Sequence, residues 1–186
     1  KPPPLGPVMT ERPEVGAGVA DVDLQGRTAL VTGSTSGIGR EAALALGRLG
    51  ADVLVHGRDR EAGRQVTDEL ERLDVDARFE AADFADVDAV RDLAAAVRDW
   101  TDDLDILVNN AGGLFQDGDR TALGVERTFH VNHLAPYLLT TELLHCLAPE
   151  ARVVTTASDP HRGVGLDPDT APEPGGGVRA SPRSQR

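Results

Sequence analysis

Short apolar runs alternate with amphipathic segments from Arg27 onward, and this alternation limits the fold more than any other feature of the sequence. Apolar runs predict strands at 27–32, 51–57, 77–83, around 106–108 and at 151–158, and helical spacing predicts helices at 37–50, 60–73, 86–100 and about 121–147. Strands that alternate with helices of these lengths predict a parallel sheet covered on both faces. The expected fold class is therefore α/β, with a doubly wound parallel sheet that is truncated after the fifth strand.

The chain divides into three regions by composition. Residues 1–24 contain prolines and glycines without apolar periodicity, and they predict a disordered arm. Residues 25–163 are expected to form one incomplete nucleotide-binding domain. Residues 164–186 are rich in proline and glycine and also predict disorder. Their composition suits either a GC-rich gene read out of frame or a linker.

Charge and composition exclude several classes of partner. The net charge of −12 disfavours nucleic acid and anionic membrane, because both require a basic surface. The apolar runs are too short to span a bilayer and no secretory signal opens the chain, so a cytoplasmic protein is expected. The single cysteine, Cys146, excludes an internal disulfide and is expected to pack inside a helix.

The stretch "TGSTSGIGR", residues 32–40, joins the first predicted strand to the first helix. Glycines at this junction let the backbone approach a pyrophosphate, and the amides of the helix N-terminus attract its negative charge. Gly33 would permit the tight turn, Gly37 the close approach, and Gly39 the packing of helix on sheet. The alternative is an ordinary glycine-rich turn, and the absence of a following Gly-Lys-Ser/Thr excludes a P-loop.

The stretch "VHGRD" ends the second strand, where a dinucleotide fold reads the adenosine ribose. An acid at this place accepts from the ribose 2′-hydroxyl, whereas an arginine accommodates a 2′-phosphate. Arg58 occupies the turn, with Arg40 as a second candidate, and Asp59 is the competing acid. NADP is therefore predicted in preference to NAD.

Five motifs occur in order: "TGSTSGIG", "HGRD", an aspartate after the third strand, "NNAG" at 109–112 and "VNHL" at 131–134. Together they resemble the short-chain dehydrogenase/reductase (SDR) family over residues 27 to about 163, and in particular its retinol-dehydrogenase-like branch. The resemblance implies a Rossmann fold with strand order 3-2-1-4-5-6-7. It also implies hydride transfer between NAD(P) and a small-molecule alcohol or carbonyl, in a complete enzyme that commonly forms homo-oligomers.

The resemblance also assigns roles to individual residues. It implies that the pyrophosphate site is lined by Thr32, Gly33, Ser34, Ser36, Gly37, Ile38 and Gly39. Asp83 would accept from the adenine amino group, while Asn109, Ala111 and Gly112 would flank the cofactor. Without the other motifs, "NNAG" would be interpreted as a strand-end turn.

Asn132 and Ser158 match the asparagine and serine that are catalytic in the family. Pro136 lies four residues after Asn132 and has no N–H, so it cannot donate to the Asn132 carbonyl within a helix. That carbonyl could hold the water of the family's proton relay, although the proline could equally be a kink without function. Ser158 would hydrogen-bond the substrate oxygen.

The family's Tyr-x-x-x-Lys motif is missing from this sequence. Its one tyrosine, Tyr137, precedes Ser158 and is expected to be a packing residue, and its one lysine is Lys1. An unaided phenol, with a pKa near 10, is a poor base at neutral pH. Two hypotheses remain: an NADP-dependent oxidoreductase represented by an incomplete, inactive chain, or a non-catalytic nucleotide-binding pseudoenzyme or regulatory module. No metal site is predicted, because His130 and His133 lack a third ligand.

Overall fold

The computed structural model describes residues 12–115, 119–157, 164–165 and 179–180. A five-stranded sheet in the order β3-β2-β1-β4-β5 forms its centre, and all neighbouring strands in it are parallel. These strands are β1 (Thr28–Val31), β2 (Asp52–Gly57), β3 (Ala77–Ala81), β4 (Leu104–Asn109) and β5 (Leu147–Thr155). The predicted α/β class and the first five places of the predicted strand order are confirmed.

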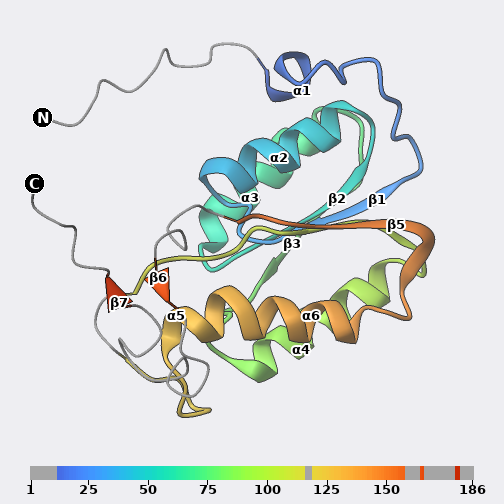
Figure 1. The fold of residues 1–186 in the computed structure, drawn as a ribbon. Coiled ribbons are helices and arrows are strands. Elements are labelled where there is room, and N and C mark those ends of the chain that lie inside the picture. The colour runs from blue at the N-terminus through green and yellow to red at the C-terminus, as the bar shows by residue number, and fades with distance from the viewer. Residues whose placement is uncertain (1–11, 116–118, 158–163, 166–178, 181–186) are drawn as a thin grey trace, which may run out of the picture.

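Helices cover both faces of the sheet (Figure 1). One face carries α2 (Gly37–Arg48) and α3 (Arg60–Glu71). The other face carries α4 (Val87–Trp100), α5 (Arg127–Phe129), the π-helix η1 (His130–Leu134) and α6 (Ala135–Glu142). The chain is therefore doubly wound, and its three layers bring the turns after the strands to one edge of the sheet.

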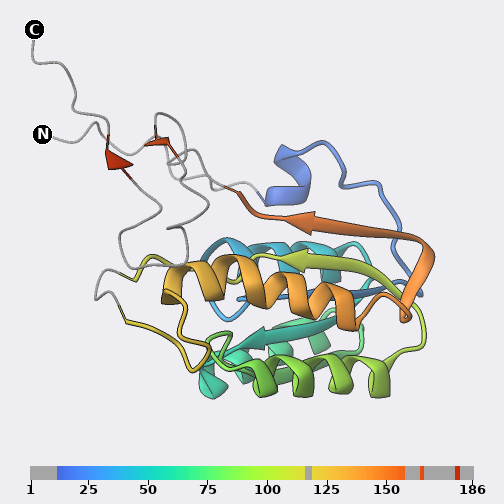
Figure 2. The same ribbon diagram turned by 60° about the horizontal axis from the view of Figure 1, so that its bottom comes forward.

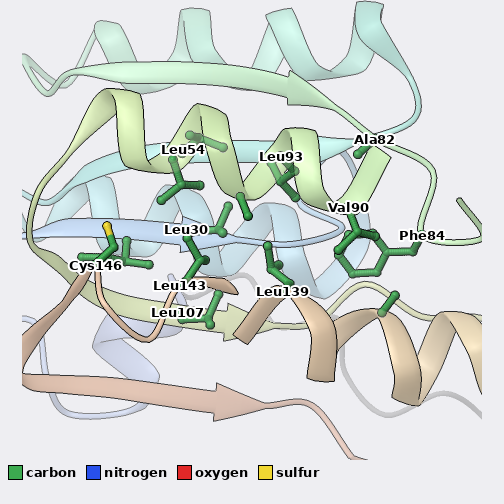
Figure 3. Packing of buried hydrophobic residues seen from close by; sticks show 14 of the residues in the cluster. Leu30, Leu54, Ala82, Phe84, Val90, Leu93, Leu107, Leu139, Leu143 and Cys146 are labelled. Atoms are coloured by element: carbon green, nitrogen blue, oxygen red, sulfur yellow. The ribbon is translucent and has the colours of Figure 1, made fainter. Parts of the chain in front are cut away.

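Two apolar cores separate the sheet from the helices. Leu30, Leu54 and Leu107 belong to the core beneath α4 and α6, which Figure 3 shows from close by. Val31 and Val55 belong to the core beneath α2 and α3. Because neighbouring residues of one strand enter opposite cores, the strands are apolar on both sides, as buried parallel strands require.

The segment between β4 and β5 differs from the single helix predicted over 121–147. The helical turns begin at Arg127, widen into a π-helix over 130–134 and end at Glu142. Strand β5 then starts at Leu147, which pairs with Leu104, and an irregularity follows before Arg152 pairs with Ile106. The regularly paired part of β5, residues 152–155, therefore lies inside the strand predicted at 151–158, while β5 itself begins earlier, at Leu147.

The structure describes residues 12–24, the second half of the predicted arm. They contain a short helix, α1 (Pro13–Gly16), whose Glu14 carboxylate accepts two hydrogen bonds from the Arg48 guanidinium at 2.5 and 2.9 Å. The Leu24 amide also donates to the carbonyl of Leu49, at the end of α2. This arrangement depends on a contact between residues far apart in sequence, which local composition does not predict.

In the tail, the structure describes only β6 (Val164–Gly165) and β7 (Arg179–Ala180), which pair antiparallel. The proposed domain boundaries at 24 and 163 stay predictions.

Strand β5 is one of the two edge strands of the sheet, the other being β3 (Figure 2). Two of its aliphatic side chains are largely open to water, Val153 at 44% and Val154 at 50% exposure. Among the described residues, no strand pairs with the outer edge of β5, and its faces are only partly covered. Within the described part of the chain, no helix has the length and apolar character needed to cross a membrane.

Candidate functional site

A cleft of about 430 Å³ opens at the C-terminal ends of the strands. It lies at the topological switch point between β1 and β4, from which successive strands are added in opposite directions. This is the usual ligand position in open α/β sheets. Its walls come from the turns after β1, β2, β3 and β4, together with Phe115, Val131 and Thr156. The turns contribute Gly33, Thr35, Ser36, Ile38 and Gly39, then 56–58, 82–84 and 110–112.

The turn after β1 leaves the first amides of α2 without a side-chain cap. Ser36 is the N-cap residue, but its hydroxyl makes no capping hydrogen bond, whereas Asp59 and Asp86 cap α3 and α4. Ile38, in the first turn of α2, is 74% exposed at the cleft wall. Uncapped helix amides beside a cleft suit an anionic ligand, since they donate hydrogen bonds and carry the positive end of the helix dipole.

Close backbone contacts fix the phosphate loop, defined here as residues 32–39. Gly33 has φ of +65°, and a Cβ there would lie 2.8 Å from the Cα of Ala111. A Cβ at Gly39 would overlap both the Gly33 carbonyl oxygen and the Asn110 amide nitrogen. The predicted roles of Gly33 in the turn and of Gly39 in packing therefore have a steric basis.

The Thr32 side chain ties the loop to the end of β4. Its hydroxyl donates to the Val108 carbonyl at 3.1 Å and accepts from the amides of Asn110 and Ala111 at 2.9 and 3.0 Å. The Asn110 amide group donates in turn to the carbonyls of Thr32 and Gly33. Asn110 was not singled out from the sequence, although it lies inside "NNAG".

The end of β2 presents a glycine, an arginine and a capping aspartate in succession. A Cβ at Gly57 would lie 2.5 Å from Cγ2 of Thr35, so this place is sterically closed to a larger side chain. Arg58 is exposed and lines the cleft. Asp59 accepts from the amides of Glu61 and Ala62, both at 3.0 Å, as the N-cap of α3. The one acid that competes with Arg58 in this turn is therefore held by its own helix.

His56, which precedes Gly57 in β2 and begins the "HGRD" motif, is a functional candidate to which the sequence analysis assigns no role. Its side chain is 2% exposed and lines the cleft. Nδ1 lies 3.2 Å from the Gly33 amide nitrogen and Nε2 lies 3.2 Å from the Ala82 carbonyl oxygen. Burial lowers the pKa of His56 to about 4, even though the Ala82 carbonyl and the Asp83 carboxylate oppose that shift.

A sequence profile described as short chain dehydrogenase matches residues 27–163. The chain belongs to the short-chain dehydrogenase family. The predicted family is thus confirmed over the segment that forms the sheet and the cleft.

Relatives and solved structures of the family show how much of it this chain spans. DnrU of Streptomyces sp. (strain C5), named for a daunorubicin C-13 ketoreductase activity, is 46% identical over 147 residues, covering 78% of this chain and 51% of that protein. Human retinol dehydrogenase 13 is 34% identical, covering 83% of this chain and 48% of that protein. A Burkholderia cenocepacia short chain dehydrogenase in complex with NADP superposes with a TM-score of 0.66 at 36% identity, over 73% of this chain and 56% of that one. The chain spans about half the length of such curated relatives.

The other SDR motif residues are divided between the cleft and its support. Asp83 and Gly112 are exposed and line the cleft. The side chains of Ser34 and Asn109 are buried behind it: Ser34 donates to the Val31 carbonyl at 2.6 Å, and Asn109 donates to the Thr140 hydroxyl at 3.0 Å.

Arg40, the second candidate for the ribose, is held on the outside of the loop. Its Nη2 donates to both carboxylate oxygens of Glu69 at 2.6 and 2.7 Å, and its Nη1 donates to Glu41 at 2.7 Å. Arg40 does not contribute to the cleft wall. Of the two arginines predicted for the ribose, Arg58 is the one that lines the cleft.

Asn132 lies in the π-helix and is exposed. Its side chain pairs with the backbone of Gly113 in both directions, accepting from the amide and donating to the carbonyl at 2.9 Å. Pro136 lies in the first turn of the following α6 and supplies no N–H to the Asn132 carbonyl. The expectation that Tyr137 packs in the interior is wrong: it is 66% exposed on α6, because the helix turns that face outward.

The remaining expectations concern the predicted catalytic serine and two histidines. Ser158 lies outside the described residues. His130 is buried with Nδ1 2.6 Å from the Thr121 hydroxyl, and His133 stacks on Phe129. Among the described residues, no group of three or more histidine, cysteine or acidic side chains is placed to hold a metal ion.

Proposed function

We propose that this chain binds NADP in the cleft at the ends of β1, β2 and β4, and that it forms the cofactor-binding part of an SDR oxidoreductase acting on an alcohol or carbonyl. Family membership supports the oxidoreductase class. The preference for NADP over NAD is supported chiefly by the end of β2, where an exposed arginine follows a sterically closed glycine.

The residues present fit a 2′-phosphorylated dinucleotide. An acid that reads a ribose 2′-hydroxyl would have to replace Gly57, where Thr35 occupies the space, or come from Asp59, which caps α3. Arg58 remains to pair with a 2′-phosphate through charge-assisted hydrogen bonds. The Burkholderia structure named above and a metagenomic short-chain oxidoreductase of 32% identity are both complexes with NADP.

Each wall of the cleft would hold a different part of the cofactor. The uncapped amides of α2 would bind the pyrophosphate, and Asp83 would accept from the adenine amino group. Ala111 and Gly112 would contact the rest of the dinucleotide. When bound, NADP supplies or accepts the hydride. Asn132 would keep the loop at Gly113 in place, since its side chain is engaged there.

For the complete enzyme we propose a lipophilic ketone or alcohol as substrate. The names of two relatives support this chemistry, one a daunorubicin C-13 ketoreductase and the other a retinol dehydrogenase. The chain as given is proposed to bind cofactor without turnover, because its sequence holds no Tyr-x-x-x-Lys. A non-catalytic nucleotide-binding module would bind NADP in the same way. Searching all frames of the downstream DNA for a Tyr-x-x-x-Lys motif separates the incomplete oxidoreductase from such a module.

The experiment compares Arg58→Ala with wild type in titrations with NADPH and NADH. Loss of a charge-assisted contact of about 1–3 kcal/mol predicts that NADPH binds roughly tenfold or more weakly, with little change for NADH. Arg72→Ala is the matched control, because Arg72 is an exposed arginine at the other end of α3. An equal loss for both nucleotides would refute the assignment of Arg58.

A further inference from the structure

The buried imidazole of His56 joins three parts of the cleft wall. Nδ1 faces the Gly33 amide of the phosphate loop, and Nε2 faces the Ala82 carbonyl just after β3, each at 3.2 Å. The ring stacks on Phe84, with centroids 4.6 Å apart and planes 23° from parallel. The backbone of the same residue adds two contacts to Ser34: its amide donates to the hydroxyl at 3.0 Å, and its carbonyl accepts from the amide at 2.8 Å.

These partners determine the protonation of the ring. A carbonyl oxygen only accepts, so Nε2 carries the proton that is donated to Ala82. A backbone amide only donates, so Nδ1 must offer its lone pair to Gly33. The imidazole is therefore the neutral Nε2–H tautomer, and the lowering of its pKa by burial keeps it neutral near pH 7.

We propose that His56 is a positioning residue for the dinucleotide, holding the Gly33 amide, and with it the phosphate loop, in the geometry that the cofactor requires. This inference rests on the proposed function. Because the Gly33 N–H is engaged by His56, the role of Gly33 is to shape the loop rather than to bind phosphate itself. The pyrophosphate is common to NADPH and NADH, so His56 should affect both nucleotides equally, unlike Arg58.

The test uses His56→Phe and His56→Asn in titrations with both nucleotides. Phenylalanine keeps an aromatic ring against Phe84 but leaves the Gly33 amide without an acceptor. We expect about a tenfold rise in Kd for NADPH and NADH alike, and an unchanged ratio between them. Asparagine can place its Oδ1 near the position of Nδ1, so it should restore affinity to within about threefold of wild type. His130→Phe is the control, since it alters a buried histidine outside the cleft wall and should leave the affinity of the folded protein unchanged.

The outcomes separate this proposal from the proposed function. If wild type binds neither nucleotide, the proposed function fails. If wild type binds and folded His56→Phe binds equally well, the positioning role is overturned while the proposed function stands. Should His56→Phe fail to fold, two other measurements test the positioning role of His56. His56→Asn must retain affinity, and the imidazole ¹⁵N shifts of the wild type near pH 7 must report the Nε2–H tautomer. An Nδ1–H tautomer would contradict the proposal.

Discussion

Acidification should destabilise the folded chain through His56, and the size of the effect follows from its burial. The imidazole is 2% exposed, and desolvation lowers its pKa from 6.5 to about 4. Above about pH 6.5 neither the folded nor the unfolded chain protonates this ring. Between about pH 6.5 and pH 4 the unfolded chain takes up the proton and the folded chain does not, so the free energy of unfolding falls as the pH falls.

The magnitude follows from the separation of the two pKa values. At about 1.4 kcal/mol for each pKa unit, the complete loss is roughly 3 kcal/mol, and most of it is reached by about pH 4.5. Below about pH 4 both states bind the proton and His56 causes no further loss. Since a domain has only about 5–15 kcal/mol of stability, the effect should be easy to resolve.

Urea unfolding at a series of pH values, followed by circular dichroism, measures the effect. His56→Asn has no titrating side chain at this position, so wild type should lose roughly 2–3 kcal/mol more than this variant between pH 7 and about pH 4.5. The exposed His145 provides the control, and His145→Asn should keep the wild-type profile. Parallel profiles for wild type and His56→Asn would show that the imidazole is not buried and neutral as the structure has it.

Three other predictions concern turnover and stability. With NADPH and a panel of aldehydes and ketones, the chain should show no turnover above background. General acid–base catalysis raises the rate about 10²–10⁴-fold, and the tyrosine that would donate the proton is missing from the sequence. A robust rate that Tyr137→Phe abolishes would contradict this prediction. The uncovered β5 should make the chain marginally stable and prone to aggregation, whereas Val154→Lys should reduce light scattering on heating; a reversible, monomeric wild-type melt well above about 50 °C would contradict it. Glu14→Gln should lower Tm by weakening the contact with Arg48, and an unchanged Tm would show that α1 adds nothing to stability.

The central sheet could be predicted because its information is local. Runs such as "ALV" and "VLV" are apolar on successive residues, as strands with two covered faces must be, and the amphipathic segments between them repeat at helical spacing. The glycines at 33 and 50 marked a turn and a helix end, and both have positive φ in the structure. Arg58 could be placed beside the cleft because it directly follows β2.

What the sequence could not predict depends on contacts between distant residues. Nothing near His56 indicates that its ring joins Gly33 to Ala82, since the three residues meet only when the sheet forms. The contact of Glu14 with Arg48, which joins α1 to α2, likewise connects residues far apart in sequence. Helical periodicity also did not separate a π-helix and an early end at Glu142 from one long helix, because the apolar spacing is nearly the same.

The measurement that tests the central claim most directly is calorimetric titration of the wild-type chain with NADPH and with NADH under the same conditions. We predict one site that binds NADPH at least about tenfold more tightly than NADH, since Arg58 lines the cleft and Asp59 is engaged as a helix cap. Absence of binding by folded protein, or tighter binding of NADH, would contradict the assignment of this cleft to NADP.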